Sequence, residues 1–249
     1  MAETDPVRQE RFILRSEGLD LRVFAAVPAN EEVASPCVQI HHGGGGFDPL
    51  YEQMAQQLAR HGFLGVALIH RGYPGSEGCQ QYGKGEVRDI GNLSEELRRR
   101  FDVDPERMAI IGYSRGAHSA LLALERYRDF CAGVLWSPPV DMARHVHVHP
   151  WIQDIIGGSP DQVPEEYACR SPLGAVEQIS CPVLILHGEQ DDVVPVEHSR
   201  LLAAALEAEG KTFELEVMPG EGHVWSQGGL LTVWRWTGAF LERYLMAET

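Results

Sequence analysis

The chain has 249 residues and a formal net charge of −15 at pH 7, with 36 acidic side chains against 21 Lys and Arg. Nucleic acids and anionic membrane surfaces are bound by clustered Lys and Arg, so we expect neither as a partner. Apolar residues make up 44% of the sequence and charged residues 23%, as in an ordinary globular protein. The acidic N-terminus is followed by no apolar segment, and no apolar run is long enough to span a bilayer, which predicts a cytoplasmic protein.

The first half of the chain predicts a hairpin followed by alternating strands and helices. Apolar and polar residues alternate over 11–27 around Glu17-Gly18, which is typical of an antiparallel hairpin, and a polar connection follows over 28–36. Continuous apolar runs predict buried parallel strands, and helical spacing predicts amphipathic helices. The strands expected here are 37–40 and 63–69, and the helices are 51–61 and 86–101. Between them, 70–78 is too rich in Gly and Pro to be either.

The second half continues the alternation around one interruption. Six prolines break the periodicity over 137–179, which predicts an insertion over the top of the sheet with short helices. The strands expected are 108–111, 132–136, 182–186 and 212–218, and the helices are 118–127, 196–209 and 230–245. This pattern predicts a single α/β domain over 1–249, with a mostly parallel sheet covered by helices on both faces. Ligands then bind beyond the carboxyl ends of the strands.

A candidate nucleophile lies where the expected strand 108–111 meets the following helix. The segment Gly112-Tyr113-Ser114-Arg115-Gly116 has small residues two positions before and after Ser114, as a sharp strand-to-helix corner requires. Ser114 at the apex would stand clear of the sheet. The amide of Arg115, at the positive end of the helix, would point at an oxyanion formed beside it.

A serine nucleophile needs an imidazole to take its proton and a carboxylate to hold that imidazole in one tautomer. Only His198 and His223 follow the expected strand 182–186 and its acidic loop, and His198 falls in the first turn of a helix, so His223 is the candidate base. The acid is Asp191 or Asp192. Adjacent loop side chains point apart, and Asp192 is better placed at the entrance of the next helix. All three groups follow strands and should therefore meet at one edge of the sheet.

The glycine run 43–46 follows the first expected parallel strand, where a second oxyanion donor is needed. Glycine lets the backbone approach the substrate carbonyl closely, and the amides of Gly44 and Gly45 are the candidate donors. A phosphate-binding loop is the rival interpretation. It is disfavoured because no Gly-Lys-Ser/Thr follows and no G-x-G-x-x-G joins a strand to a helix.

Other side chains suggest a pocket and a possible metal site. His145, His147 and His149 alternate, so an extended backbone would place all three on one side, near Asp141. We favour a solvated or partner-facing edge of the insertion over a metal site, and expect no metal and no cofactor. Trp136 and Trp151 flank the insertion. Together with Tyr73 they are candidate walls of the substrate pocket.

Taken in order, these motifs resemble the α/β-hydrolase superfamily and, within it, the catalytic domain of the prolyl oligopeptidase family, with the dienelactone hydrolases next. The matching stretches are His42-Gly43-Gly44, Arg71-Gly72-Tyr73 with Gly75 and Gly78, Val103-Asp104-Pro105, Gly112 to Gly116, Tyr167 with Arg170-Ser171-Pro172, His187-Gly188 with Asp191, Val194-Pro195 and Ser199, and Gly222-His223. They cover roughly residues 37 to 245. The resemblance implies an α/β-hydrolase fold with Ser114 as nucleophile, Asp191 as orienting acid and His223 as base.

The sequence thus predicts a serine hydrolase that cleaves carboxylic esters of small acyl groups through an acyl-enzyme on Ser114. Oligopeptidases of the prolyl oligopeptidase family carry an N-terminal β-propeller, whereas about 36 residues precede the first core strand here. This difference favours a small-molecule ester over a peptide as the substrate. Dienelactone hydrolases usually have cysteine in place of Ser114. The alternatives are a peptidase of the prolyl oligopeptidase type and a non-catalytic binding protein of the same fold. A homo-oligomer is left open.

Overall fold

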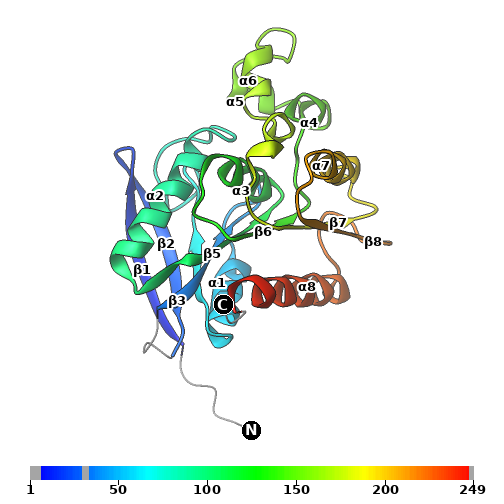
Figure 1. The fold of residues 1–249 in the computed structure, drawn as a ribbon. Coiled ribbons are helices and arrows are strands. Elements are labelled where there is room, and N and C mark those ends of the chain that lie inside the picture. Colours follow the sequence, from blue (N-terminus) through cyan, green and yellow to red (C-terminus); the bar gives the residue numbers. More distant parts are fainter. Residues whose placement is uncertain (1–6, 30–33, 247–249) are drawn as a thin grey trace.

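The structure is a computed structural model that describes residues 7–29 and 34–246, and one sheet runs through it (Figure 1). Its strand order is β1-β2-β4-β3-β5-β6-β7-β8. The strands are β1 Arg8–Ser16, β2 Leu19–Val27, β3 Ser35–His41, β4 Leu64–Leu68, β5 Val103–Tyr113, β6 Ala132–Trp136, β7 Val183–Gly188 and β8 Phe213–Met218. The helices are α1 Pro49–Arg60, α2 Gly85–Arg100, α3 Arg115–Arg126, α4 Met142–Val148, α5 Ile152–Ile156, α6 Pro164–Ala168, α7 Glu197–Ala208 and α8 Gln227–Leu245.

The sheet begins with an antiparallel hairpin and continues as parallel strands. β1 pairs with β2 around Glu17 and Gly18, which both have positive φ (51° and 82°), as a two-residue type I′ turn requires. β2 pairs antiparallel with β4, and each later pair from β4 and β3 to β7 and β8 is parallel. The expected hairpin and mostly parallel sheet are therefore present. The expected connection over 28–36 lies partly outside the described residues, as does the acidic N-terminus.

Helices cover both faces of the sheet, α1 and α8 on one and α2, α3 and α7 on the other (Figure 1). Every residue of β4 and of β6 is buried, because these central strands are packed on both sides. Each face has its own apolar cluster, one formed with α1 and α8 and the other with α2, α3 and α7. The protein therefore has the layered α/β fold that the apolar runs of its sequence predict.

The insertion 137–179 leaves the sheet after β6 and carries α4, α5 and α6, which rise beyond the main body (Figure 1). It has a small apolar core of its own, to which the loop before α2 contributes Tyr82. The insertion also contacts the edge of the sheet. Nε2 of His149 lies 2.8 Å from the carbonyl oxygen of Val193. The expected short helices are therefore present, and they contact the loop that follows β7.

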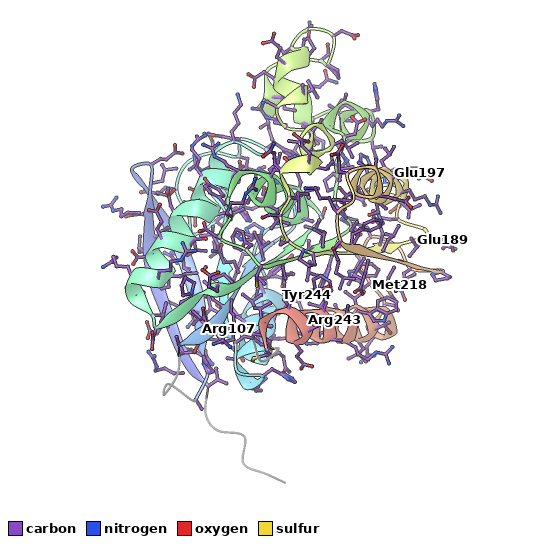
Figure 2. The ribbon with its side chains drawn as sticks, in the orientation of Figure 1. Arg107, Glu189, Glu197, Met218, Arg243 and Tyr244 are labelled. Carbon is purple, nitrogen blue, oxygen red and sulfur yellow. The ribbon has the colours of Figure 1, made fainter. Side chains whose placement is uncertain are left out.

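Hydrogen bonds tie neighbouring elements of the fold together, and Figure 2 labels Arg107, Glu189 and Met218, which make three of them. Beyond β7 the amide of Glu189 donates to the carbonyl of Met218, at the end of β8, at 3.0 Å. In β5, Arg107 donates to the carbonyls of Leu245 at 3.4 Å and Ala34 at 3.1 Å, which ties the C-terminal turn of α8 to the sheet. The first of these contacts brings together the two loops that carry the expected acid and base.

Candidate active site

Ser114 lies at the corner between β5 and α3. Its backbone has φ 53° and ψ −118°, a conformation that L residues adopt only under constraint, and its side chain lies at the carboxyl edge of the sheet. Glycine is required on both sides of the corner. A Cβ on Gly112 would lie 2.5 Å from the amide nitrogen of Ala117, and a Cβ on Gly116 would overlap the carbonyl of His41. The expected sharp corner is present, and its glycines allow α3 to pack directly on β3 and β5.

The three groups expected to form a triad are in contact. Nε2 of His223 lies 3.0 Å from Oγ of Ser114, and Nδ1 of His223 lies 2.7 Å from Oδ2 of Asp191. The carboxylate can only accept at neutral pH, so Nδ1 carries the proton and Nε2 is free to accept the serine proton. This is the tautomer that a general base needs in order to activate a serine hydroxyl.

Of the two adjacent acids, Asp191 is the one that contacts His223. Oδ1 of Asp191 accepts from the amides of Val193 at 3.0 Å and Val194 at 2.7 Å, whereas Asp192 is exposed. Burial raises the pKa of Asp191, but hydrogen bonds from the His187 and His223 rings and from the Val194 amide outweigh it, and the pKa lies well below its usual value. Asp191 is thus ionised and fixed in one orientation.

The loop that carries His223 is held from two sides. At the end of β7, a Cβ on Gly188 would lie 2.5 Å from the carbonyl oxygens of Glu221 and Gly222, so only glycine allows this close approach. On the other side, the Tyr113 hydroxyl donates to the carbonyl of His223 at 2.7 Å, and its ring stacks on the imidazole at 5.2 Å between centroids. Sequence analysis missed Tyr113, because nothing in its neighbourhood on the chain points to a loop 110 residues away.

A buried ion pair lies behind the nucleophile, and sequence analysis missed it as well. Nη2 of Arg115 donates to Oε1 of Glu86, at the start of α2, at 2.8 Å, and both side chains are almost fully buried. Burial alone would raise the pKa of Glu86, but Arg115 and the amides of Gln81 and Tyr82 lower it overall. Glu86 therefore stays ionised. Its sequence context, an amphipathic charged helix, gave no sign of a buried carboxylate.

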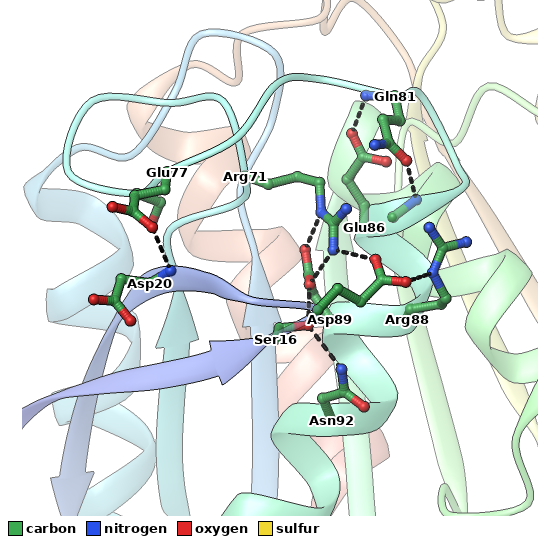
Figure 3. A network of polar contacts seen from close by, with 12 residues as sticks. Ser16, Asp20, Arg71, Glu77, Gln81, Glu86, Arg88, Asp89 and Asn92 are labelled. Atoms are coloured by element: carbon green, nitrogen blue, oxygen red, sulfur yellow. Dashed lines mark hydrogen bonds and ion pairs between the residues drawn. The ribbon is translucent and has the colours of Figure 1, made fainter.

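The loop between β4 and α2 is anchored by a second buried network (Figure 3). Arg71 donates to both carboxylate oxygens of Asp89, at 2.7 and 2.6 Å, and to Glu17 in the β1–β2 turn at 2.8 Å. Ser16 also donates to Asp89. Because bidentate Arg–carboxylate pairs are geometrically demanding, this network fixes the loop that carries Tyr73 against α2.

Two of the three expected pocket residues are placed differently from the prediction. Trp136 is 2% exposed, and its indole donates to Thr237 of α8 at 3.1 Å, so it packs in the core and the prediction that it lines a pocket is wrong. Tyr73 is 7% exposed, and its hydroxyl donates to the carbonyl of Gly44, which places it behind the glycine run. Trp151, in the insertion, is 51% exposed beside Tyr82, and its role in a pocket stays a prediction.

The three histidines of the insertion do not lie on one side of an extended segment, as the sequence suggested. His145 and His147 belong to α4, which is helical because Asp141 caps it by accepting from the amide of Arg144 at 3.0 Å. The one-turn spacing brings the rings of His145 and His149 to 4.7 Å. In the described part of the chain, no group of three His, Cys, Asp or Glu side chains is arranged to hold a metal ion. No helix there is both long and apolar enough to cross a bilayer, and the cytoplasmic location stays a prediction.

Comparison with known proteins agrees with this geometry. The chain is 33% identical to the uncharacterized peptidase YtmA of Bacillus subtilis over 213 residues, which cover 84% of this chain and 83% of that protein. Among solved structures, a puromycin-hydrolyzing peptidase of Mycobacterium tuberculosis superposes with a TM-score of 0.89 at 24% identity. An acylaminoacyl peptidase of Pyrococcus horikoshii superposes with a TM-score of 0.85 at 22% identity.

These two structural matches cover 97% and 98% of this chain but only 40% and 42% of the solved chains, and at this identity they show the fold alone. They establish the α/β-hydrolase fold that the sequence resembles. The profile of the prolyl oligopeptidase family matches residues 51–246, which include the corner at Ser114 and both loops that meet it. A serine beside an imidazole and a buried carboxylate, on this fold and within this profile, makes the chain a serine hydrolase that belongs to the prolyl oligopeptidase family.

Proposed function

We propose that this protein is a serine peptidase that hydrolyses short peptides, with Ser114 as nucleophile, His223 as general base and Asp191 as the acid that orients it. The observation that carries the proposal is the continuous chain from Ser114 Oγ through His223 to Asp191 Oδ2, with distances of 3.0 and 2.7 Å. Such a chain serves no packing purpose that apolar residues would not serve better. It is the arrangement that activates a serine hydroxyl.

The proposed reaction is acyl transfer in two halves. His223 Nε2 takes the proton of Ser114 as Oγ attacks the carbonyl carbon, and the oxyanion accepts from the amide of Arg115 in the first turn of α3 and from the glycine run after β3. Amides of a first helical turn have no acceptor within the helix, so the Arg115 amide is available for this purpose. His223 then protonates the leaving amine, and a water molecule activated by the same imidazole releases the acyl group from Ser114.

A peptide is favoured over the ester that the sequence analysis put first. The matched family is one of oligopeptidases, and the relative that aligns over 83% of its own length bears the name of a peptidase. The ester interpretation depended on the small number of residues ahead of the core, which carries no weight beside this similarity. Esters remain chemically easier substrates for the same serine, because an alkoxide leaves more readily than an amine.

The test compares two substrates with the same acyl group. We expect an N-acylated dipeptide p-nitroanilide to be cleaved with kcat/KM within about 100-fold of its p-nitrophenyl ester, and both activities to be lost in Ser114→Ala. Ser226→Ala is the matched control, since this serine caps α8 by accepting from Gly229 and lies outside the triad. Ester cleavage without measurable anilide cleavage would restore the ester interpretation. Absence of any labelling of Ser114 by a fluorophosphonate would refute both.

A further inference from the structure

The glycine run after β3 forms a tight turn beside the nucleophile. The amide of Gly46 donates to the carbonyl of Gly43 at 3.1 Å, which makes Gly44 and Gly45 the two central residues of a β-turn. A Cβ on Gly43 would lie 3.5 Å from the carbonyl oxygen of Tyr113, so the turn packs against the residue that precedes Ser114. Neither central glycine has positive φ, as in a type I turn.

The peptide that joins Gly44 to Gly45 has two accessible orientations. Turning over the central peptide of a type I turn gives a type II turn, in which the second central residue must take positive φ. Glycine takes positive φ as readily as negative φ. The peptide is planar and trans, so the Gly44 carbonyl and the Gly45 amide always point in opposite directions. A turn with glycine at both central positions therefore does not decide by itself where the Gly45 amide points.

The Tyr73 hydroxyl selects one of the two orientations. It donates to the carbonyl oxygen of Gly44 at 3.1 Å and accepts from Nη1 of Arg115 at 3.1 Å. The Tyr73 ring is buried edge-on against His42, with 4.6 Å between centroids, and has little freedom to move. The Arg115 guanidinium is itself fixed by its buried ion pair with Glu86.

We propose that Tyr73 is a positioning residue for the oxyanion site, because by holding the Gly44 carbonyl it keeps the Gly45 amide turned toward the oxyanion that forms at Ser114. The inference rests on the proposed function, since it requires acyl transfer at Ser114. Arg115 then takes part in both halves of the oxyanion site. Its amide is one donor, and its side chain holds the Tyr73 hydroxyl that orients the other.

The expected size of the effect follows from the strength of one hydrogen bond. A hydrogen bond of ordinary net strength shifts a two-state population by about 2- to 13-fold. Tyr73→Phe keeps the ring and removes this bond, so the rate of acyl transfer should fall by a factor in that range. This is less than the loss of about 10²- to 10³-fold that follows removal of a donor itself. The loss should fall on kcat, with KM unchanged, because the oxyanion exists only in the transition state and intermediate.

The experiment measures how fast a small fluorophosphonate labels Ser114 in the full chain. Its phosphoryl oxygen takes the place of the oxyanion, and no natural substrate has to be known. Gly45→Ala provides the decisive comparison, because alanine disfavours the positive φ of the flipped turn and its Cβ would meet no atom within 4 Å. In the Gly45→Ala background, Tyr73→Phe should slow labelling less than about 2-fold.

Tyr82→Phe is the matched control. Tyr82 also lies under the Arg115 guanidinium, at 4.5 Å, but its hydroxyl contacts His145, so its removal should leave the labelling rate unchanged. Equal rates for wild type and Tyr73→Phe would overturn the inference. The inference would also be overturned if Tyr73→Phe slowed labelling equally with and without Gly45→Ala. A shift of the acid limb of the pH dependence of the labelling rate in Tyr73→Phe would overturn it too, since either result would mean a general disturbance of the site. A wild-type chain that is not labelled at all contradicts the proposed function instead.

Discussion

Asp191→Asn should trap His223 in the tautomer that cannot accept the proton of Ser114. Oδ1 of Asp191 accepts from the amides of Val193 and Val194, at 3.0 and 2.7 Å. Both partners are donors, so the amide oxygen of the variant has to take this position, and its NH2 group has to face Nδ1 of His223. Nδ1 must then accept, and the ring proton moves to Nε2, the atom 3.0 Å from Ser114 Oγ.

The expected loss in kcat is about 10⁴-fold, or about 5.5 kcal/mol of transition-state stabilisation. That is the size measured for the same replacement in a serine protease of unrelated fold, where the tautomer is inverted in the same way. KM should change little, because the tautomer governs proton transfer and not binding. The assay is the steady-state hydrolysis of the p-nitroanilide and of its matched ester, with fluorophosphonate labelling to count active sites.

Asp192→Asn is the control, because Asp192 lies next in the chain and is exposed, and the His223 ring is hydrogen-bonded to Asp191 and Ser114 instead. Its kcat should stay within about 2-fold of wild type. If Asp191→Asn retained more than about a tenth of the activity, the argument from the two backbone amides would be wrong. If Asp192→Asn were the more damaging change, the acid would have been assigned to the wrong residue.

Three further predictions concern other parts of the chain. Burial, with a smaller effect of Glu177, raises the pKa of Glu125 to about 9. The folded chain therefore keeps a proton that the unfolded chain loses above about pH 4.5, and its stability falls as the pH rises from about 4.5 to 9. Glu125→Gln should raise the free energy of unfolding by an amount that grows over this range, reaching about 1–3 kcal/mol near pH 7; thermal unfolding measured across this pH range checks it, and a pH-independent gain would contradict it. Tyr113→Phe should lower kcat about 3- to 10-fold through loss of its hydrogen bond to the His223 carbonyl, and an unchanged kcat would remove its positioning role. Excess EDTA should leave hydrolysis unchanged, whereas a loss restored by zinc would assign a metal to the histidines of the insertion.

The sheet could be predicted from the sequence because its central strands are buried on both faces. The apolar runs 63–69 and 132–136 correspond to β4 and β6, in which each side chain is buried. Helix starts were less well placed, because they are set by caps outside the apolar pattern. α8 begins at Gln227 instead of the expected 230, since Ser226 accepts from the amide of Gly229 at 3.0 Å.

The histidines of the insertion show why periodicity failed there. A spacing of two residues predicts one side of an extended chain, but the same residues are four apart from first to last, which is one helical turn. The competing signal was Asp141, a good N-cap three residues before the amide of Arg144, and it decided the outcome. In a short segment with both patterns present, the capping residue was the better guide to the backbone conformation.

The triad could be predicted because each of its members follows a strand of a parallel sheet, and such ends lie at one edge. The contacts of Tyr113, Tyr73 and Glu86 could not, because each is made across the fold, to a backbone carbonyl or to a buried guanidinium, and Tyr73 was expected only as a pocket wall. No spacing rule relates a tyrosine to a carbonyl in a separate loop. Sequence patterns locate the groups that react, whereas the groups that orient them are defined by packing.

The glycines near His223 also show that packing, and not flexibility, positions the base. Gly222 directly precedes His223, yet among the described glycines it is not one with positive φ. The constrained position is Gly188, at the end of β7, where a Cβ would lie 2.5 Å from the carbonyls of Glu221 and Gly222. The base is therefore brought to the acid by close packing of two loops at the end of neighbouring parallel strands. Flexibility of the loop would loosen the 2.7 Å contact on which the tautomer of His223 depends.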